Sequence, residues 1–271
     1  MASVPRALVS SLALALHRLG RLAGPRSAAR ILYYHSISDD PVRSSVSPEA
    51  FAAHVEYLRG GYELASLSEV VRRLGVGAPL APRTVVITLD DGFRDNYEQA
   101  FPILARAGVT ATVFLTASYI GTDRLPTLSR TDFVPRPLDW AQVREMHAFG
   151  MEFGSHTLTH PMLSRVPLAE ARREIAESRR LIEDKLGAPA PFFCYPRGDF
   201  NEAVKRIVKE EGYLAACTTL PGANDGTTDP FALRRTYVGR RDTPSEFAKK
   251  VAGAYDLLQE GVRLWRRLQA R

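Results

Sequence analysis

One stretch of sequence decides the fold: TVVITLDDGF at residues 84–93. Its first six residues are mostly valine, isoleucine and threonine, which favour a buried strand. Glycine then permits a sharp turn, so Asp90 and Asp91 are expected at the carboxyl end of that strand, where α/β folds carry their chemistry. Neighbouring side chains on a strand face opposite ways, but a turn can direct both carboxylates to one place. Taken alone, the stretch is better explained as an Asp-Gly turn with solvated carboxylates, and the rest of the chain is what favours a functional role.

Strand-like and helix-like segments alternate along the rest of the chain. Besides 84–89, strands are expected at 31–35, 110–116, 152–156, 192–195, 214–219 and 231–238. Helices are expected at 48–59, 67–74, 94–107, 139–149, 167–186 and 202–211. This alternation predicts an α/β fold with a parallel sheet, open or closed into a barrel. Residues 118–137 hold Gly121 and three prolines among polar residues, which predicts a long surface loop of a kind that is often functional.

The composition is that of an ordinary globular protein. Of the 271 residues, 45% are hydrophobic and 24% are charged, which is enough material for one α/β barrel. No apolar run is long enough to span a bilayer. Cys194 and Cys217 lie far apart inside apolar runs, which indicates reduced core thiols.

The net charge of +6 is concentrated at the two ends of the chain. No acidic residue precedes Asp39, and arginines gather in both end segments: Arg6, Arg18, Arg21, Arg26 and Arg30, then Arg263, Arg266, Arg267 and Arg271. Basic ends suit an anionic membrane surface, although arginines solvated on helix faces explain them equally well. No nucleic-acid motif accompanies them. Residues 6–23 predict an amphipathic helix rather than a signal peptide, so we expect a cytoplasmic protein with peripheral membrane contact, and secretion is the alternative.

Unusual polar residues recur at four expected strand ends. They are His35, the Asp90–Asp91 pair, the His156–His160 pair, and Pro196-Arg197-Gly198. Three of the six histidines lie at these positions. His-x-x-x-His alone is a weak signal, and a single such histidine is more often structural. The coincidence of all four groups at one face of the sheet is what indicates a functional site.

The residue types in these groups suit metal-dependent hydrolysis. Two imidazoles and one carboxylate form a three-ligand site with an open position, as in catalytic zinc centres. A metal there lowers the pKa of bound water, and a second carboxylate beside the ligands can act as its general base. The adjacent acids Asp90 and Asp91 allow this division, since one can bind the ion while the other stays free. His35 can protonate the leaving amine.

Three motifs carry a family resemblance. TLDDG at 88–92, GSHTLTHP at 154–161 and YPRG at 195–198 resemble the first three motifs of the polysaccharide deacetylases, chitin-deacetylase-like carbohydrate esterases with a NodB-homology domain. The resemblance runs from about residue 30 to residue 240 and implies a distorted, seven-stranded (β/α) barrel that removes acetyl groups from a glycan. By motif match, Asp90 is the base and Asp91, His156 and His160 hold one divalent metal ion. Zinc is the expected ion, and cobalt, nickel, manganese or iron also suits these ligands.

The sequence departs from the family pattern in three places. Cys194 takes the position of the arginine that orients the base, so Arg197 or Arg235 is the expected substitute. The late Leu-x-His motif that supplies the acid is absent after residue 200; LYYH at 32–35 instead resembles an amino-terminal motif of a subgroup acting on poly-N-acetylglucosamine, which makes His35 the expected acid. No clean version of the fourth, Asp-Trp-bearing motif is visible. The candidate substrate-binding or orienting residues are Tyr195, Pro196, Arg197 and Arg235.

These inferences predict three parts of the chain: a basic amphipathic segment at 1–29, a catalytic domain at 30–240 and a C-terminal helix at 241–271. The leading hypothesis is a metal-dependent deacetylase acting on N-acetylated sugars of a polysaccharide or glycolipid precursor. Hydrolysis of another small amide is a second enzymatic option. A catalytically idle glycan-binding or assembly protein is a third hypothesis, and the intact set of Asp90, Asp91, His156 and His160 argues against it.

Overall fold

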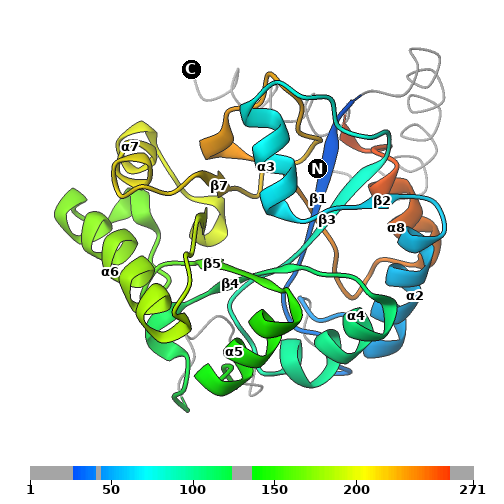
Figure 1. Ribbon diagram of the computed structural model, residues 1–271, viewed down its shortest axis with the longest axis horizontal. Coiled ribbons are helices and arrows are strands. Elements are labelled where there is room, and N and C mark those ends of the chain that lie inside the picture. Colours follow the sequence, from blue (N-terminus) through cyan, green and yellow to red (C-terminus); the bar gives the residue numbers. More distant parts are fainter. Residues whose placement is uncertain (1–26, 41–43, 124–135, 257–271) are drawn as a thin grey trace, which may run out of the picture.

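The computed structural model describes residues 27–40, 44–123 and 136–256 (Figure 1). Three expectations therefore lie outside the described residues, wholly or in part. They are the amphipathic helix at 6–23, most of the loop at 118–137, and the part of the C-terminal helix beyond residue 256.

Parallel strands form the centre of the fold, in the order β7-β6-β5-β4-β3-β1-β8. Their bounds are β1 (Ala29–Tyr34), β3 (Thr84–Leu89), β4 (Thr112–Leu115), β5 (Glu152–Ser155), β6 (Phe192–Cys194), β7 (Ala215–Cys217) and β8 (Arg235–Tyr237). A two-residue strand, β2 (Glu63–Leu64), pairs with β3 outside this path. The ends of the path approach each other, since Cys217 of β7 bridges Leu233 just before β8. Within the described residues the sheet is thus nearly closed, which confirms the predicted distorted (β/α) barrel.

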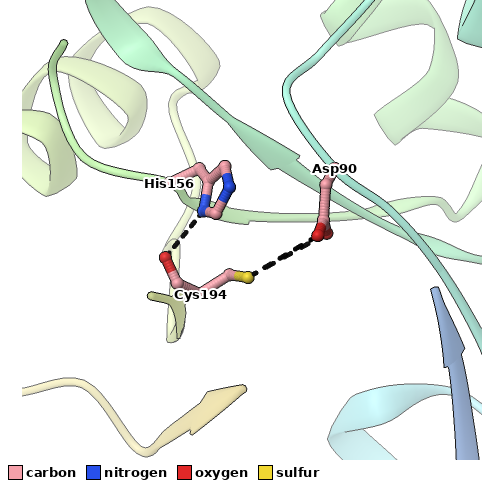
Figure 2. Close-up of side chains that lie close together, drawn as sticks. All are labelled: Asp90, His156 and Cys194. Atoms are coloured by element: carbon pink, nitrogen blue, oxygen red, sulfur yellow. Dashed lines mark hydrogen bonds between the residues drawn. The ribbon is translucent and has the colours of Figure 1, made fainter. Parts of the chain in front are cut away.

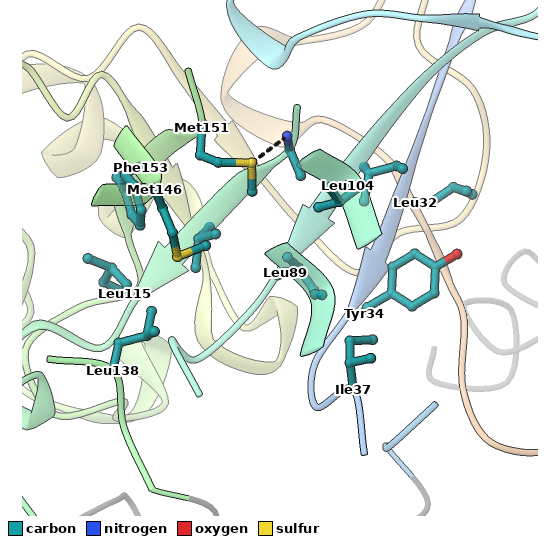
Figure 3. Close-up of a cluster of buried hydrophobic side chains, with 14 of the residues drawn as sticks. Leu32, Tyr34, Ile37, Leu89, Leu104, Leu115, Leu138, Met146, Met151 and Phe153 are labelled. Atoms are coloured by element: carbon teal, nitrogen blue, oxygen red, sulfur yellow. Dashed lines mark hydrogen bonds between the residues drawn. The ribbon is translucent and has the colours of Figure 1, made fainter. Parts of the chain in front are cut away.

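Strand β3 lies between β1 and β4 and is buried along its whole length. Its side chains alternate between two hydrophobic clusters. Val85, Ile87 and Leu89 belong to the larger cluster, which also contains residues of the surrounding helices (Figure 3). Val86 belongs to a second cluster, with Phe114 of β4 and other strand residues. Burial of both faces explains why this strand is a nearly continuous apolar run in the sequence.

Helices surround the strands (Figure 1). Their bounds are α2 (Pro48–Arg59), α3 (Leu67–Gly75), α4 (Phe101–Ala107), α5 (Trp140–Phe149), α6 (Leu168–Leu186), α7 (Glu202–Glu210) and α8 (Pro244–Val251). Ser47 caps α2, because its side chain accepts a hydrogen bond from the N–H of Ala50. In the described part of the chain, no helix combines the length and apolar character needed to cross a membrane.

Several predicted elements are longer than the observed ones, and three of the differences have a clear local cause. The helix expected at 94–107 starts with a π-helical turn at Asn96–Ala100, and Pro102 lies in the first turn of α4, where its missing N–H is tolerated. The strand expected at 231–238 is confined to β8, because Pro230–Ala232 forms a 3₁₀ turn. Within the described residues, the C-terminal helix expected at 241–271 is confined to α8, which ends at Val251, and Gly253 follows with a φ of 79°.

Candidate active site

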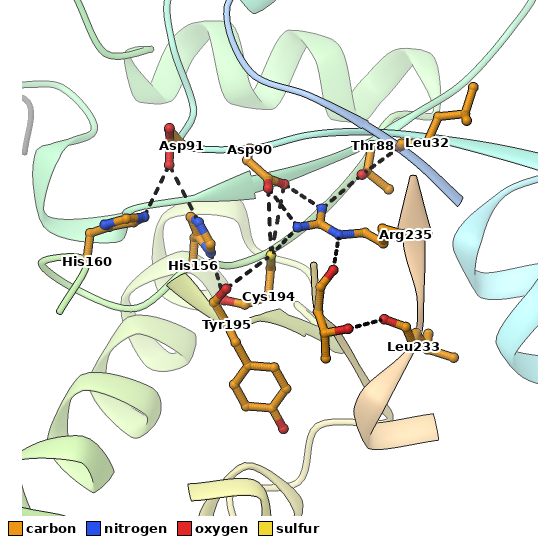
Figure 4. Close-up of polar contacts among 11 residues, drawn as sticks. Leu32, Thr88, Asp90, Asp91, His156, His160, Cys194, Tyr195, Leu233 and Arg235 are labelled. Carbon is orange, nitrogen blue, oxygen red and sulfur yellow. Dashed lines mark hydrogen bonds and ion pairs between the residues drawn. The ribbon is translucent and has the colours of Figure 1, made fainter. Parts of the chain in front are cut away.

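Asp90 and Asp91 follow β3 directly, and both side chains are directed toward the same polar cluster (Figure 4). A left-handed turn makes this possible, with φ of 75° at Asp91 and 73° at Gly92. Glycine suits position 92 because of this φ, and a Cβ there would also lie 2.9 Å from Leu115 Cδ2, which would have to shift. Both carboxylates are buried, with exposed fractions of 3% for Asp90 and 2% for Asp91.

His156 and His160 lie on the turn that follows β5. His160 and Thr157 both adopt left-handed backbone conformations, with φ of 66° and 67°. The Thr157 hydroxyl accepts a hydrogen bond from the N–H of His160 at 2.9 Å. The two rings lie edge to face, with a centroid distance of 4.8 Å and an interplanar angle of 72°. Their Nε2 atoms lie 3.5 Å (His156) and 3.6 Å (His160) from Asp91 Oδ1.

The donor atoms of Asp91, His156 and His160 fit a divalent metal ion. They lie within 4.8 Å of one another. His156 donates from Nδ1 to the Cys194 carbonyl at 2.7 Å, so its Nε2 presents a lone pair (Figure 2). Asp91 Oδ1 is buried and has no hydrogen-bond partner among the described residues. A buried carboxylate oxygen that lies 3.5 and 3.6 Å from two imidazole nitrogens and lacks a hydrogen-bond partner among the described residues suits a bound cation.

The pKa values of this cluster agree with such a site. Burial lowers the pKa of His156 to about 4 and that of His160 to about 3, so both imidazoles are neutral at pH 7. Burial, reinforced by the negative charge of Asp90, raises the pKa of Asp91 to about 8. A bound cation opposes this last shift, because it stabilises the ionised carboxylate.

Asp90 pairs with Arg235 of β8 (Figure 4). The guanidinium donates from Nη1 to Asp90 Oδ1 and from Nη2 to Oδ2, each at 2.7 Å. Its other N–H groups donate to Thr218 O at 2.9 Å, Thr88 Oγ1 at 3.1 Å and Cys194 Sγ at 2.9 Å. Every N–H of the guanidinium is therefore used. Burial favours protonated Asp90, but the charge and hydrogen bonds of Arg235 outweigh it and lower the pKa of Asp90 to about 2.

Cys194 lies beside the same ion pair. Its Sγ is 3.9 Å from Asp90 Oδ2, and burial raises the pKa of the thiol, so it stays protonated (Figure 2). Asp90, His156 and Cys194 form a second group with atoms close enough for a metal. A protonated thiol is a poor ligand, and Asp90 is already engaged by Arg235. The first group therefore fits a metal better.

The other candidate substrate residues are placed differently. Tyr195 is fully buried, stacks on Phe200 at a centroid distance of 4.7 Å and donates its hydroxyl to the Phe231 carbonyl. Its ring is directed away from the acids and histidines (Figure 4). Pro196 is also buried, so neither of these two side chains is available to a sugar. Arg197 is exposed, has a φ of 57°, and its charge opposes protonation of both Asp91 and His160. Arg197 therefore lies at the solvent-exposed edge of the site, and Asp90 pairs with Arg235 instead.

His35 follows β1, the strand next to β3. The N–H of Asp90 donates to the Tyr34 carbonyl at 2.9 Å, which brings the two strand ends together. The His35 side chain is partly exposed, and its buried Nδ1 has no partner within the described residues. Burial lowers its pKa, while the negative charge of Asp90 acts in the opposite direction. His35 thus lies beside Asp90 at the same face of the barrel, with its side chain partly exposed.

Two residues near His35 escaped the sequence analysis. Asn96 donates from Nδ2 to the His35 carbonyl at 2.8 Å, and Asp95 accepts hydrogen bonds from Ser36 Oγ and the N–H of Ile37. They hold the segment after β1 against the segment after β3. Polar residues closely following the Asp-Asp-Gly turn are the signal that could have identified them, but the helical pattern at 94–107 concealed it.

Comparison with known proteins places this geometry in context. A sequence model described as polysaccharide deacetylase matches residues 77–216. The chain is 31% identical over 227 residues to YxkH of Bacillus subtilis, which is named for polysaccharide deacetylase activity, covering 83% of this chain and 75% of YxkH. It is 24% identical over 231 residues to the poly-beta-1,6-N-acetyl-D-glucosamine N-deacetylase of Staphylococcus aureus, covering 80% of this chain and 76% of that enzyme.

Two solved structures share the fold. IcaB from Ammonifex degensii superposes with a TM-score of 0.73 at 23% identity, over 84% of this chain and 97% of IcaB. The Streptococcus pyogenes deacetylase PplD superposes with a TM-score of 0.71 at 24% identity, over 83% of this chain and 98% of PplD. Both superpositions cover most of this chain. Together with the sequence match, they lead to one conclusion: the chain belongs to the polysaccharide deacetylase family.

Proposed function

We propose that this protein is a metal-dependent hydrolase that removes acetyl groups from N-acetylated sugars of a polysaccharide or glycolipid precursor. One observation carries the proposal: Asp91, His156 and His160 direct three buried or half-buried donor atoms to one point, beside a second carboxylate that is held ionised. The name of the Staphylococcus aureus relative supports poly-N-acetylglucosamine as the substrate class to test first.

In this proposal Asp91, His156 and His160 hold one divalent ion, with zinc the first expectation and cobalt, nickel, manganese and iron the alternatives. When bound, such an ion would lower the pKa of water, so that a nucleophile able to attack an amide is available near neutral pH. Left-handed backbone at Asp91 and His160 supports this role, since strained conformations of non-glycine residues concentrate at functional sites.

Asp90 is the proposed general base. With its pKa lowered to about 2 it is fully ionised at neutral pH, so it can always accept a proton. The same low pKa makes Asp90 a weak base. It can therefore take a proton only from a water whose own pKa the metal ion would lower. Arg235 is the proposed positioning residue, because its two parallel hydrogen bonds fix the plane of the Asp90 carboxylate.

His35 is the proposed general acid. Burial lowers its pKa, which makes the protonated imidazole a stronger acid toward the leaving amine. The neighbouring charge of Asp90 favours that protonated form. Arg197, exposed at the rim, is proposed to contact the glycan.

The test combines metal analysis with acetate release from N-acetylglucosamine oligomers. We expect the purified chain to bind one equivalent of divalent metal and to release acetate. Asp91→Ala should lose both properties, because it removes a ligand. Bound metal without acetate release from any N-acetylated sugar would reject the deacetylase proposal and favour a glycan-binding role. Acetate release that is unaffected by full metal removal would reject the metal assignment.

A further inference from the structure

Glu174 of α6 is a buried carboxylate with no part in the chemistry proposed above. Its side chain is 1% exposed, whereas Arg173 and Glu177 on the same helix are 52% and 50% exposed. Glutamate is rarely buried this fully unless it is paired. The Arg173 guanidinium lies 3.8 Å from Glu174 Oε1, too far for a hydrogen bond. The carboxylate is therefore held by other groups.

Those groups belong to the turn that carries the two histidines. Glu174 Oε2 accepts hydrogen bonds from the N–H of Leu158 at 2.9 Å and from the N–H of Thr159 at 2.8 Å. Oε1 accepts one from the Thr159 hydroxyl at 2.7 Å. Leu158 and Thr159 lie between His156 and His160 in the chain. One carboxylate thus binds the part of the backbone that sets the spacing of the two imidazoles.

This turn requires support from outside. Thr157 and His160 both have left-handed backbone, which costs about 1–3 kcal/mol for each non-glycine residue. A second contact with α6 acts nearby, since Ser155 Oγ lies 2.6 Å from Ser178 Oγ and accepts a hydrogen bond from the N–H of Thr157. The helix therefore holds the turn at two points, and the contact through Glu174 is the charged one.

We propose that Glu174 is a positioning residue: it fixes the separation of His156 and His160 and thereby sets the affinity of the metal site. This inference rests on the proposed function. Residues that support metal ligands typically change metal affinity about 10- to 100-fold when they are removed. Glu174→Ala leaves two backbone N–H groups without their acceptor. Glu174→Gln retains an oxygen for both, and its NH₂ can donate to the Thr159 hydroxyl.

The experiment is a Co²⁺ titration of the full chain, followed by visible absorption, which reports ligand geometry as well as affinity. Glu177→Ala is the matched control, because it removes an exposed carboxylate from the same helix. We expect Glu174→Ala to bind Co²⁺ about 10- to 100-fold more weakly with an altered spectrum. Glu174→Gln should restore the wild-type spectrum, and Glu177→Ala should match the wild type.

Wild-type affinity and spectrum in Glu174→Ala would overturn the inference. If Glu174→Ala does not fold, Glu174→Asp replaces it in the test, because aspartate keeps the carboxylate but is shorter by one methylene. Wild-type Co²⁺ affinity in Glu174→Asp would also overturn the inference. Failure of the wild-type chain to bind Co²⁺ at all would instead reject the metal site of the proposed function. The two failures are therefore distinguishable.

Discussion

Replacing Arg235 by methionine tests the ion pair at the centre of the site. Methionine keeps much of the side-chain volume but removes the charge and leaves Asp90 buried without a cation. The Arg235 side chain is 0% exposed and that of Asp90 is 4% exposed, so water cannot replace the lost hydrogen bonds. Removing one partner of a buried pair typically costs about 3–5 kcal/mol. We therefore expect Arg235→Met to lower the free energy of unfolding by that amount at pH 7.

The loss should depend on pH. In the wild type the pKa of Asp90 is lowered, so the stability that it contributes is present above its unfolded pKa and is lost as the pH falls toward about 2. Arg235→Met removes that contribution, because burial alone raises the pKa of Asp90. The difference in stability between variant and wild type should therefore shrink between pH 7 and pH 3. Urea denaturation at several pH values measures it.

An exposed ion pair provides the control. Arg59 donates to Glu56 Oε1 at 2.8 Å, and the two side chains are 46% and 66% exposed. Arg59→Met should cost about 1 kcal/mol or less. The double variant Arg235→Met/Asp90→Asn should recover part of the stability lost in Arg235→Met, since no buried charge remains unpaired, yet stay inactive. A loss below about 1 kcal/mol in Arg235→Met, equal to the control, would refute the argument from burial.

Three further predictions concern the chemistry. Asp90→Asn should retain the metal but lower kcat about 10²- to 10⁴-fold, because an amide cannot accept the proton; wild-type turnover in a folded variant would exclude the base assignment. His35→Ala should reduce kcat far more than Zn²⁺ affinity, and an unchanged kcat would exclude it as the acid. Since the pKa of Asp91 is raised to about 8, Zn²⁺ must displace a proton below that pH, so affinity should weaken about tenfold for each pH unit between 8 and 6. Calorimetry in buffers of different ionisation enthalpy should then detect about one proton released for each Zn²⁺ bound. Zn²⁺ affinity that does not change with pH would contradict the argument that burial raises the pKa of Asp91.

Local pattern was sufficient to predict the strand ends that carry the site. The β-favouring run at 84–89 and the glycine after the two acids are short-range signals, and the observed β3 has the predicted bounds. The turn at 156–160 is similarly local, since Gly154 and Pro161 favour a strand followed by a loop. Proximity of His35, Asp90 and His156 followed from a general rule, because carboxyl ends of parallel strands lie at one face of a barrel.

The motif alone did not show which way the side chains at the end of β6 point, but strand alternation does. Cys194 and Tyr195 are neighbours, and alternation along an extended chain directs them to opposite sides. Cys194 enters the cluster inside the sheet, whereas Tyr195 belongs to the cluster that contains residues of α6 and α7. Naming Tyr195 as a candidate substrate-binding or orienting residue did not take this alternation into account. Glu174 was missed for a different reason, since a glutamate in an amphipathic helix normally indicates a solvated face.

The pairing of Asp90 with Arg235 depends on closure of the barrel. These residues are separated by 145 positions, and no local pattern connects them. Arg235 reaches Asp90 because β8 pairs with β1 on one side, while Leu233 pairs with β7 on the other. Cys194 of β6 is small enough to leave room for this guanidinium and contacts it through Sγ. The orientation of the proposed base is therefore completed by the last strand of the chain, so a variant that loosens β8 should lose activity before it loses the metal ligands.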